Sequence, residues 1–141
     1  MKILLAVDGS EFSRRAANFV ASNFNALAAA PEIHCLYVHA ALPVPGARAK
    51  IPKSVIEKYQ REESEAALAV ALKELQAAKI PVKASWVVGD IVEEVARYIA
   101  ANKIDRIVVG SHGRGRLAAL ALGSVAMKIL ATVKTPALII R

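Results

Sequence analysis

Short runs of hydrophobic residues alternate along the chain with longer segments in which hydrophobic residues recur every three or four positions. The short runs are rich in Val, Ile and Leu, which is typical of buried β-strands. They predict strands over residues 2–7, 33–40, 82–88, 104–110 and 136–140. The periodic segments predict helices over about residues 11–27, 54–78, 91–102 and 124–133.

Turn and capping residues separate these segments. The first hydrophobic run ends at Asp8, which is followed by Gly and Ser, a sequence that favours a turn into a helix. Asp90 and Glu93 have the spacing of a capping box at the start of the third helix. Residues 41–50 contain two prolines and one glycine and are therefore predicted to form a surface loop.

The regular alternation of strand and helix predicts an α/β fold of one domain over residues 1–141. Right-handed crossovers would make it an open, doubly wound, Rossmann-like parallel sheet of five strands, in the order 3-2-1-4-5, with helices on both faces. Ligands of such folds bind at the carboxyl ends of the strands, where the strand order reverses. The loops after the first four strands are therefore the places to search for a site.

Composition narrows the class of protein further. Hydrophobic residues make up 55% and charged residues 22%, which is typical of a globular chain. The single cysteine, Cys35, excludes an internal disulfide and favours a reducing, cytoplasmic location. We expect neither a signal peptide, because the first apolar run is too short, nor a membrane span, because no apolar stretch reaches about 18 residues.

The segment from Gly110 to Val125 carries the strongest candidate chemistry. Glycines lie where the fourth strand ends, in the loop at Gly113, and at Gly123, where the last helix is predicted to begin. Glycine permits positive φ and leaves no Cβ between a ligand and the backbone amides. A helix N-terminus adds free N–H donors and a favourable dipole, and the hydroxyl of Ser124 adds another donor. The segment therefore predicts a phosphate cradle, although neither a P-loop nor a dinucleotide fingerprint is present.

Gly110, Gly113, Gly123 and Ser124 match the pattern Gly-x2-Gly-x9-Gly-Ser/Thr. Together with the opening ILLAVDGSEFS, the segment VVGDIVEEVARYIA and the closing TPALIIR, this motif resembles the universal stress proteins of the class that binds ATP. The resemblance covers essentially the whole chain. It is the combination of these segments that is specific, since each alone is weak.

The resemblance also implies a set of binding residues. It places Asp8 beside the adenosine portion of the nucleotide, and it gives the backbone of Val38 a contact with adenine. It implies that the segments flanking the glycine loop hold the ribose and the phosphates, and that Mg²⁺ or Mn²⁺ binds through the phosphates without a dedicated protein metal site. The implied residues are Ala6, Val7, Asp8, Val38, Val109, Gly110, His112, Gly113, Gly123, Ser124 and Val125.

The chain departs from the commoner family pattern at Gly115 and Arg116, inside the nine-residue stretch of the motif. Arg114 and Arg116 either donate charge-assisted hydrogen bonds to terminal phosphates or are solvated loop charges. His112 has two interpretations as well: an acid, base or phosphate donor, or a structural residue of the loop.

The last strand is apolar on both faces, yet a terminal strand is expected at an edge of the sheet, where unpaired backbone groups favour pairing with another chain. Similar proteins dimerise through this strand. The resemblance therefore implies a homodimer formed by Ala137, Leu138, Ile139 and Ile140.

The function that this pattern favours is that of an ATP-binding stress-response or signalling module. A slow ATPase or autophosphorylating enzyme is the alternative, but neither a convincing base nor a magnesium carboxylate occurs in the loop, so no catalytic residue is predicted. The net charge of +7 also makes nucleic-acid binding an alternative function. This alternative is disfavoured because only 5% of residues are aromatic. A nucleotide-free dimerisation module is a further alternative. Every charged residue from Arg106 to the end of the chain is basic. The positive electrostatic field of these residues favours a phosphorylated ligand.

Overall fold

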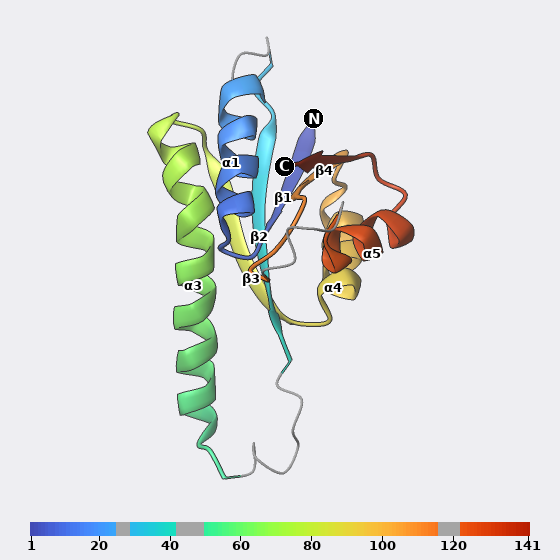
Figure 1. Cartoon of the computed structure of the whole chain (residues 1–141). Helices are drawn as coiled ribbons and strands as arrows, with labels where there is room; N and C mark the ends of the chain where they lie inside the picture. Colours follow the sequence, from blue (N-terminus) through green and yellow to red (C-terminus); the bar gives the residue numbers. More distant parts are fainter. Residues whose placement is uncertain (25–28, 42–49, 116–121) are drawn as a thin grey trace.

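The computed structural model describes residues 1–24, 29–41, 50–115 and 122–141. Within these ranges five strands form one parallel sheet in the order β3-β2-β1-β4-β5, which confirms the predicted fold class (Figure 1). The strands are β1 (Lys2–Val7), β2 (Glu32–Ala40), β3 (Val82–Gly89), β4 (Arg106–Gly110) and β5 (Ala137–Ile140).

Helices cover both faces of the sheet. α1 (Glu11–Phe24) and α3 (Lys53–Ala77) pack on one face, and α4 (Ile91–Asn102) and α5 (Ser124–Thr132) pack on the other (Figure 1). In the part of the chain that the structure describes, no helix combines the length and the apolar character needed to cross a membrane.

The core consists of two hydrophobic layers, one on each side of the sheet. Strand geometry sends successive side chains to opposite faces, so Ile3 and Leu5 of β1 pack against α1 and α3, whereas Leu4 packs against α4 and α5. Both faces of the central strand are therefore buried, which explains why its sequence is a continuous apolar run instead of an alternating one.

Most boundaries agree with the predicted ones or differ from them by one residue. The fourth strand differs by two residues: it begins at Arg106 and not at Ile104. The reason is the end of α4, where Lys103 adopts a left-handed conformation (φ 55°) and the amide of Ile104 donates to the carbonyl of Ile99. Residues 25–28, predicted as the end of the first helix, most of the 41–50 loop and Arg116 lie outside the described residues.

β5 lies at an edge of the sheet, as predicted, and pairs with β4. Its side chains divide between the two layers: Ile140 packs with α1 and α3, and Ala137 and Ile139 pack with α4 and α5. Leu138 is 38% exposed. An apolar strand whose outer edge is open is a surface suited to pairing with a second copy of the chain.

Candidate functional site

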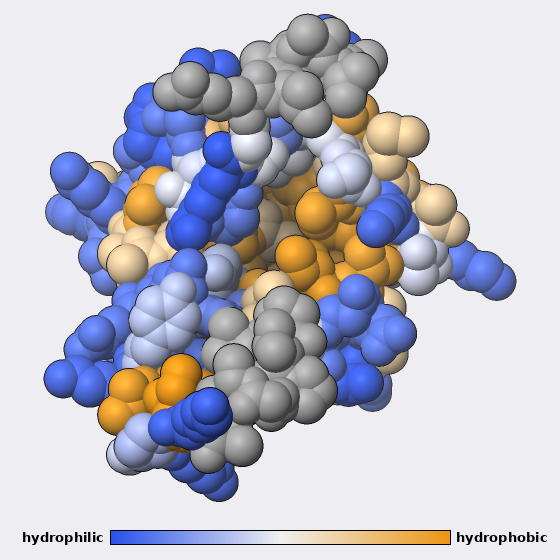
Figure 2. Space-filling model, turned by 60° about the horizontal axis from the view of Figure 1, so that its bottom comes forward, coloured by the Kyte–Doolittle hydropathy of each residue, from blue (hydrophilic) through white to orange (hydrophobic). Residues whose placement is uncertain are grey.

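A cavity of about 370 Å³ opens at the carboxyl ends of β1, β2 and β4, beside the start of α5. In Figure 2 it is a hollow with a hydrophobic floor and hydrophilic side chains on its rim. All described residues that the sequence singled out line it: Ala6, Val7, Asp8, Val38, Val109, Gly110, His112, Gly113, Arg114, Gly123, Ser124 and Val125. The loops at the carboxyl ends of the strands, where the sequence predicts a site, therefore border this cavity.

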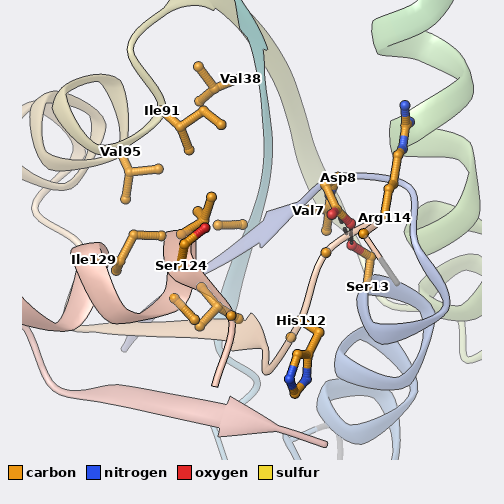
Figure 3. Close-up of a pocket in the computed structure, with 18 of the residues that line it drawn as sticks. Val7, Asp8, Ser13, Val38, Ile91, Val95, His112, Arg114, Ser124 and Ile129 are labelled. Carbon is orange, nitrogen blue, oxygen red and sulfur yellow. Dashed lines mark hydrogen bonds between the residues drawn. The ribbon is translucent and has the colours of Figure 1, made fainter. Parts of the chain in front are cut away.

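One end of the cavity is apolar. Val38 of β2 lies there beside Ile91 and Val95 of α4, with Ile129 of α5 closing the wall (Figure 3). Ile91 and Val95 lie on the apolar face of the helix predicted over residues 91–102, and Val95 is buried, but the sequence did not show that this face borders a cavity. Such a wall suits a flat, weakly polar group such as an aromatic ring.

The other end of the cavity is polar and centres on Asp8. The Oδ1 atom of Asp8 accepts hydrogen bonds from the Ser13 hydroxyl (2.8 Å) and from the Ser10 amide (2.9 Å), and the Asp8 amide donates to Ser13 Oγ (2.9 Å). Ser13 is buried, so this network holds the carboxylate in one orientation (Figure 3). The sequence did not identify Ser13, because a serine in the first turn of a helix has no signature of such a role.

Asp8 does not cap α1. The cap is Ser10, whose hydroxyl oxygen accepts a hydrogen bond from the amide of Ser13 at 3.3 Å. Since Oδ1 of Asp8 is engaged by the network, its Oδ2 atom remains directed at the glycine loop, where a Cβ on Gly113 would stand only 2.6 Å away. The interpretation of Asp8 as an ordinary helix cap is therefore excluded by the geometry.

The glycines of the motif serve the close packing of the loop. A Cβ on Gly110 would stand 2.7 Å from Cβ of Phe12, and one on Gly123 would stand 3.0 Å from the carbonyl oxygen of Ser111. Among the described glycines only Gly9 has a positive φ (79°), so the expectation that the motif glycines supply positive φ is wrong. They are required because the loop lies against α1, Asp8 and its own preceding residues. At Gly115, which departs from the family pattern, no atom of the described residues beyond its chain neighbours lies within 4 Å of the Cβ position.

The N-terminus of α5 faces the cavity. The amide of Gly123 donates to the carbonyl of Ser111 (2.7 Å) and so fixes the start of the helix to the loop. No side-chain cap bonds the first turn among the described residues. The amides of Ser124, Val125 and Ala126, all in the cavity lining, therefore present the positive end of the helix dipole to whatever binds there.

His112 is a lining residue whose ring packs on the protein. The centroids of its imidazole and the Phe12 ring are 5.1 Å apart, and its Nδ1 atom lies 3.0 Å from Ser111 Oγ. In Figure 3 the ring lies beside α1 and is turned away from Ser124. These contacts favour the structural interpretation of His112.

Arg114 crosses from the glycine loop toward α3. Its Nη1 atom lies 3.5 Å from Oε1 of Glu63, and its side chain is about half exposed (51%). Figure 3 shows the guanidinium beside α3, directed away from Ser124. Across the described ranges, no three His, Cys, Asp or Glu side chains are grouped closely enough to hold a metal ion.

The comparisons with known proteins agree with this architecture. The model of the universal stress protein family matches residues 1–141, so the chain belongs to that family. A relative from Thermus aquaticus, the universal stress protein in the QAH/OAS sulfhydrylase 3′ region, is 30% identical over 140 residues, which cover 99% of this chain and 97% of the relative.

Solved structures show the same fold. The hypothetical protein MJ0577 superposes with a TM-score of 0.82 at 27% identity, covering 99% of this chain and 94% of that one. A universal stress protein in complex with cAMP gives a TM-score of 0.70 at 22% identity, covering 100% and 97% of the two chains. The universal stress protein of Archaeoglobus fulgidus in complex with dAMP gives 0.68 at 19% identity, covering 100% and 98%.

Proposed function

We propose that the chain is an ATP-binding universal stress protein that acts as a nucleotide-dependent signalling module. The observation that carries this proposal is that one cavity combines an apolar end at Val38 with an uncapped helix N-terminus at Ser124. A nucleotide has the same division, with a flat base at one end and phosphates at the other. That related structures contain cAMP or dAMP supports the choice of an adenine nucleotide.

The base would lie at the apolar end. Val38, Ile91 and Val95 offer hydrophobic contacts to both its edge and its face. The family resemblance assigns adenine to the backbone of Val38, which is the same place. Burial of an aromatic base against aliphatic side chains is favourable because apolar surface leaves water on both partners.

The ribose would lie near Asp8. A fixed carboxylate accepts hydrogen bonds but donates none, so the free Oδ2 atom suits a hydroxyl group and disfavours a phosphate. The phosphates would instead lie along Gly113 and against the first turn of α5, where backbone amides, the Ser124 hydroxyl and the helix dipole favour negative charge. Mg²⁺ or Mn²⁺ would bind through the phosphates.

The signalling role is supported by a connection between the loop and the edge strand. The amide of Ser111 donates to the carbonyl of Ile140 at 2.6 Å, so the glycine loop and the end of β5 are joined directly. We propose that β5 pairs with a second copy to form a homodimer in the cytoplasm, a compartment that the single, buried Cys35 fits. Ligand contacts in the loop would then reach the dimer interface through one hydrogen bond.

The test begins with the purified protein. Heat extraction followed by ion-exchange chromatography of the supernatant should release an adenine nucleotide, and stripped protein should melt at a higher temperature when ATP is added. Absence of both the nucleotide and the ATP-dependent melting shift would contradict the proposal.

A further inference from the structure

Glu63 of α3 lies between two nitrogen-bearing side chains, those of His39 and Arg114, that come from different parts of the chain. Its Oε2 atom is 2.6 Å from Nε2 of His39, at the end of β2, and its Oε1 atom is 3.5 Å from Nη1 of Arg114, in the glycine loop. Glu63 thus joins α3 to the end of β2 and to Arg114 of the glycine loop. Neither His39 nor Glu63 was predicted to take part in the site.

The two contacts of Glu63 differ in strength. His39 is 5% exposed, and its two ring nitrogens face oxygen acceptors: Nε2 faces Glu63, and Nδ1 lies 2.8 Å from the carbonyl of Ala40. Both ring nitrogens are thus within hydrogen-bond distance of an oxygen atom, which fixes the ring of His39 beside Glu63. The Arg114 contact is longer and lies at a half-exposed side chain, where ion pairs contribute little.

This asymmetry makes the guanidinium of Arg114 easy to release. When it leaves, Glu63, whose side chain is 30% exposed, keeps its short hydrogen bond to His39. Arg114 is itself one of the residues that line the cavity, next to Gly113. An arginine side chain has several rotatable bonds, so a change of rotamer would be enough to turn the guanidinium from α3 toward the cavity.

We propose that Glu63 is a specificity-determining residue of the nucleotide site, because it competes with the ligand's outer phosphates for Arg114. In the free protein the guanidinium rests on Glu63. An adenine nucleotide with a chain of phosphates draws it away, whereas a monophosphate is too short to do so. This inference rests on the proposed function and adds to it a residue that sets the preference between nucleotides of different phosphate length.

Competition for Arg114 predicts the direction in which nucleotide affinity changes. The negative charge of Glu63 opposes binding of any phosphate that needs Arg114. Removal of that charge should therefore strengthen binding of ATP and leave binding of AMP nearly unchanged. The opposite sign would mean that Glu63 holds the loop in the shape that the ligand needs. The experiment separates these two roles.

The measurement is the dissociation constant of ATP and of AMP for nucleotide-stripped wild-type protein and its variants, at one salt concentration. Glu63→Gln keeps an acceptor for His39 but loses the charge. It should bind ATP about three- to tenfold more tightly than wild type, the range of one charge-assisted contact at a half-exposed site. Arg114→Gln should weaken ATP binding by a similar factor, and the double variant should match Arg114→Gln.

Glu62→Gln is the matched control. Glu62 is the neighbouring residue on α3 and pairs with Lys58 at 3.8 Å on the exposed surface, so the substitution changes the net charge equally and should leave both constants unchanged. A Glu63→Gln variant that binds ATP more weakly, or that keeps its effect when Arg114 is also replaced, would overturn the proposal. An unchanged ratio of ATP to AMP affinity in Arg114→Gln would overturn it even if Glu63→Gln failed to fold.

The same data separate this inference from the function on which it rests. If wild-type protein binds neither nucleotide, the proposed function fails and the role of Glu63 fails with it. If wild-type protein binds ATP but the variants do not change the ratio of affinities, only the role of Glu63 fails.

Discussion

Gly113 and Asp8 approach each other so closely that a Cβ on Gly113 would stand 2.6 Å from Oδ2 of the carboxylate. The contact joins the loops after β4 and β1, which are far apart in the sequence. Because Ser13 and Ser10 hold the other carboxylate oxygen, Asp8 cannot turn aside without breaking two hydrogen bonds. The position of the glycine loop therefore depends on the absence of a single side-chain carbon.

Gly113→Ala should displace either the loop or the Asp8 carboxylate and so weaken ATP binding by about tenfold or more, the loss of at least 1.4 kcal/mol. Gly115→Ala is the control, since its Cβ would meet no atom within 4 Å and its φ is not positive. Titration calorimetry on both variants checks the prediction. Equal affinities for the two would show that the contact with Asp8 has no part in the site.

Ser13→Ala should lower the free energy of unfolding by about 1–3 kcal/mol, because it leaves the Asp8 amide and one carboxylate oxygen without their buried partner. Ser22→Ala, on the exposed side of the same helix, should change it by less than about 0.5 kcal/mol. Urea unfolding of both variants makes the comparison. A loss at Ser22 as large as that at Ser13 would count against the network.

The thiol of Cys35 should react with a disulfide reagent only after unfolding. Burial raises its pKa from 9.0 to about 12, so the folded chain holds almost no thiolate at mildly alkaline pH. Unfolded chains ionise first as the pH rises, so this group's contribution to stability is complete below pH 9.0 and is lost progressively toward about 12. Rapid labelling of folded protein, timed by absorbance, would be inconsistent with this burial.

Leu138→Glu should convert the proposed homodimer into monomers. The change places two like charges near each other across a paired β5 edge, where Leu138 is 38% exposed. Val55→Glu on α3, at a side chain that is 54% exposed, is the control and should leave the dimer intact. Sedimentation velocity distinguishes the species, and a wild-type chain that sediments as a monomer would refute the dimer itself.

The fold could be predicted because its determinants are local. The strands are short segments rich in apolar residues, each helix has one apolar face, and the regular alternation of such elements is typical of a doubly wound sheet. The strand ends and the glycine pattern then located the cavity, because parallel strands bring the loops at their carboxyl ends to one edge of the sheet.

The details of the site depend on tertiary contacts and could not be predicted in the same way. Ser13 became part of the site only through the orientation of Asp8, and Glu63 only through the packing of α3 beside the glycine loop. The glycines of the motif also lack the positive φ that glycine permits. Glycine is needed at these positions because atoms of Phe12, Asp8 and Ser111 lie where a Cβ would stand. A local sequence pattern does not show which atoms will lie there.

The most direct test of the central claim is a calorimetric titration of nucleotide-stripped protein with ATP in the presence of Mg²⁺. We expect saturable binding of one ATP per chain, with a negative heat-capacity change from burial of the base at the apolar end of the cavity. The absence of saturable binding up to about 1 mM ATP, an affinity too weak to matter for a signalling module, would contradict it.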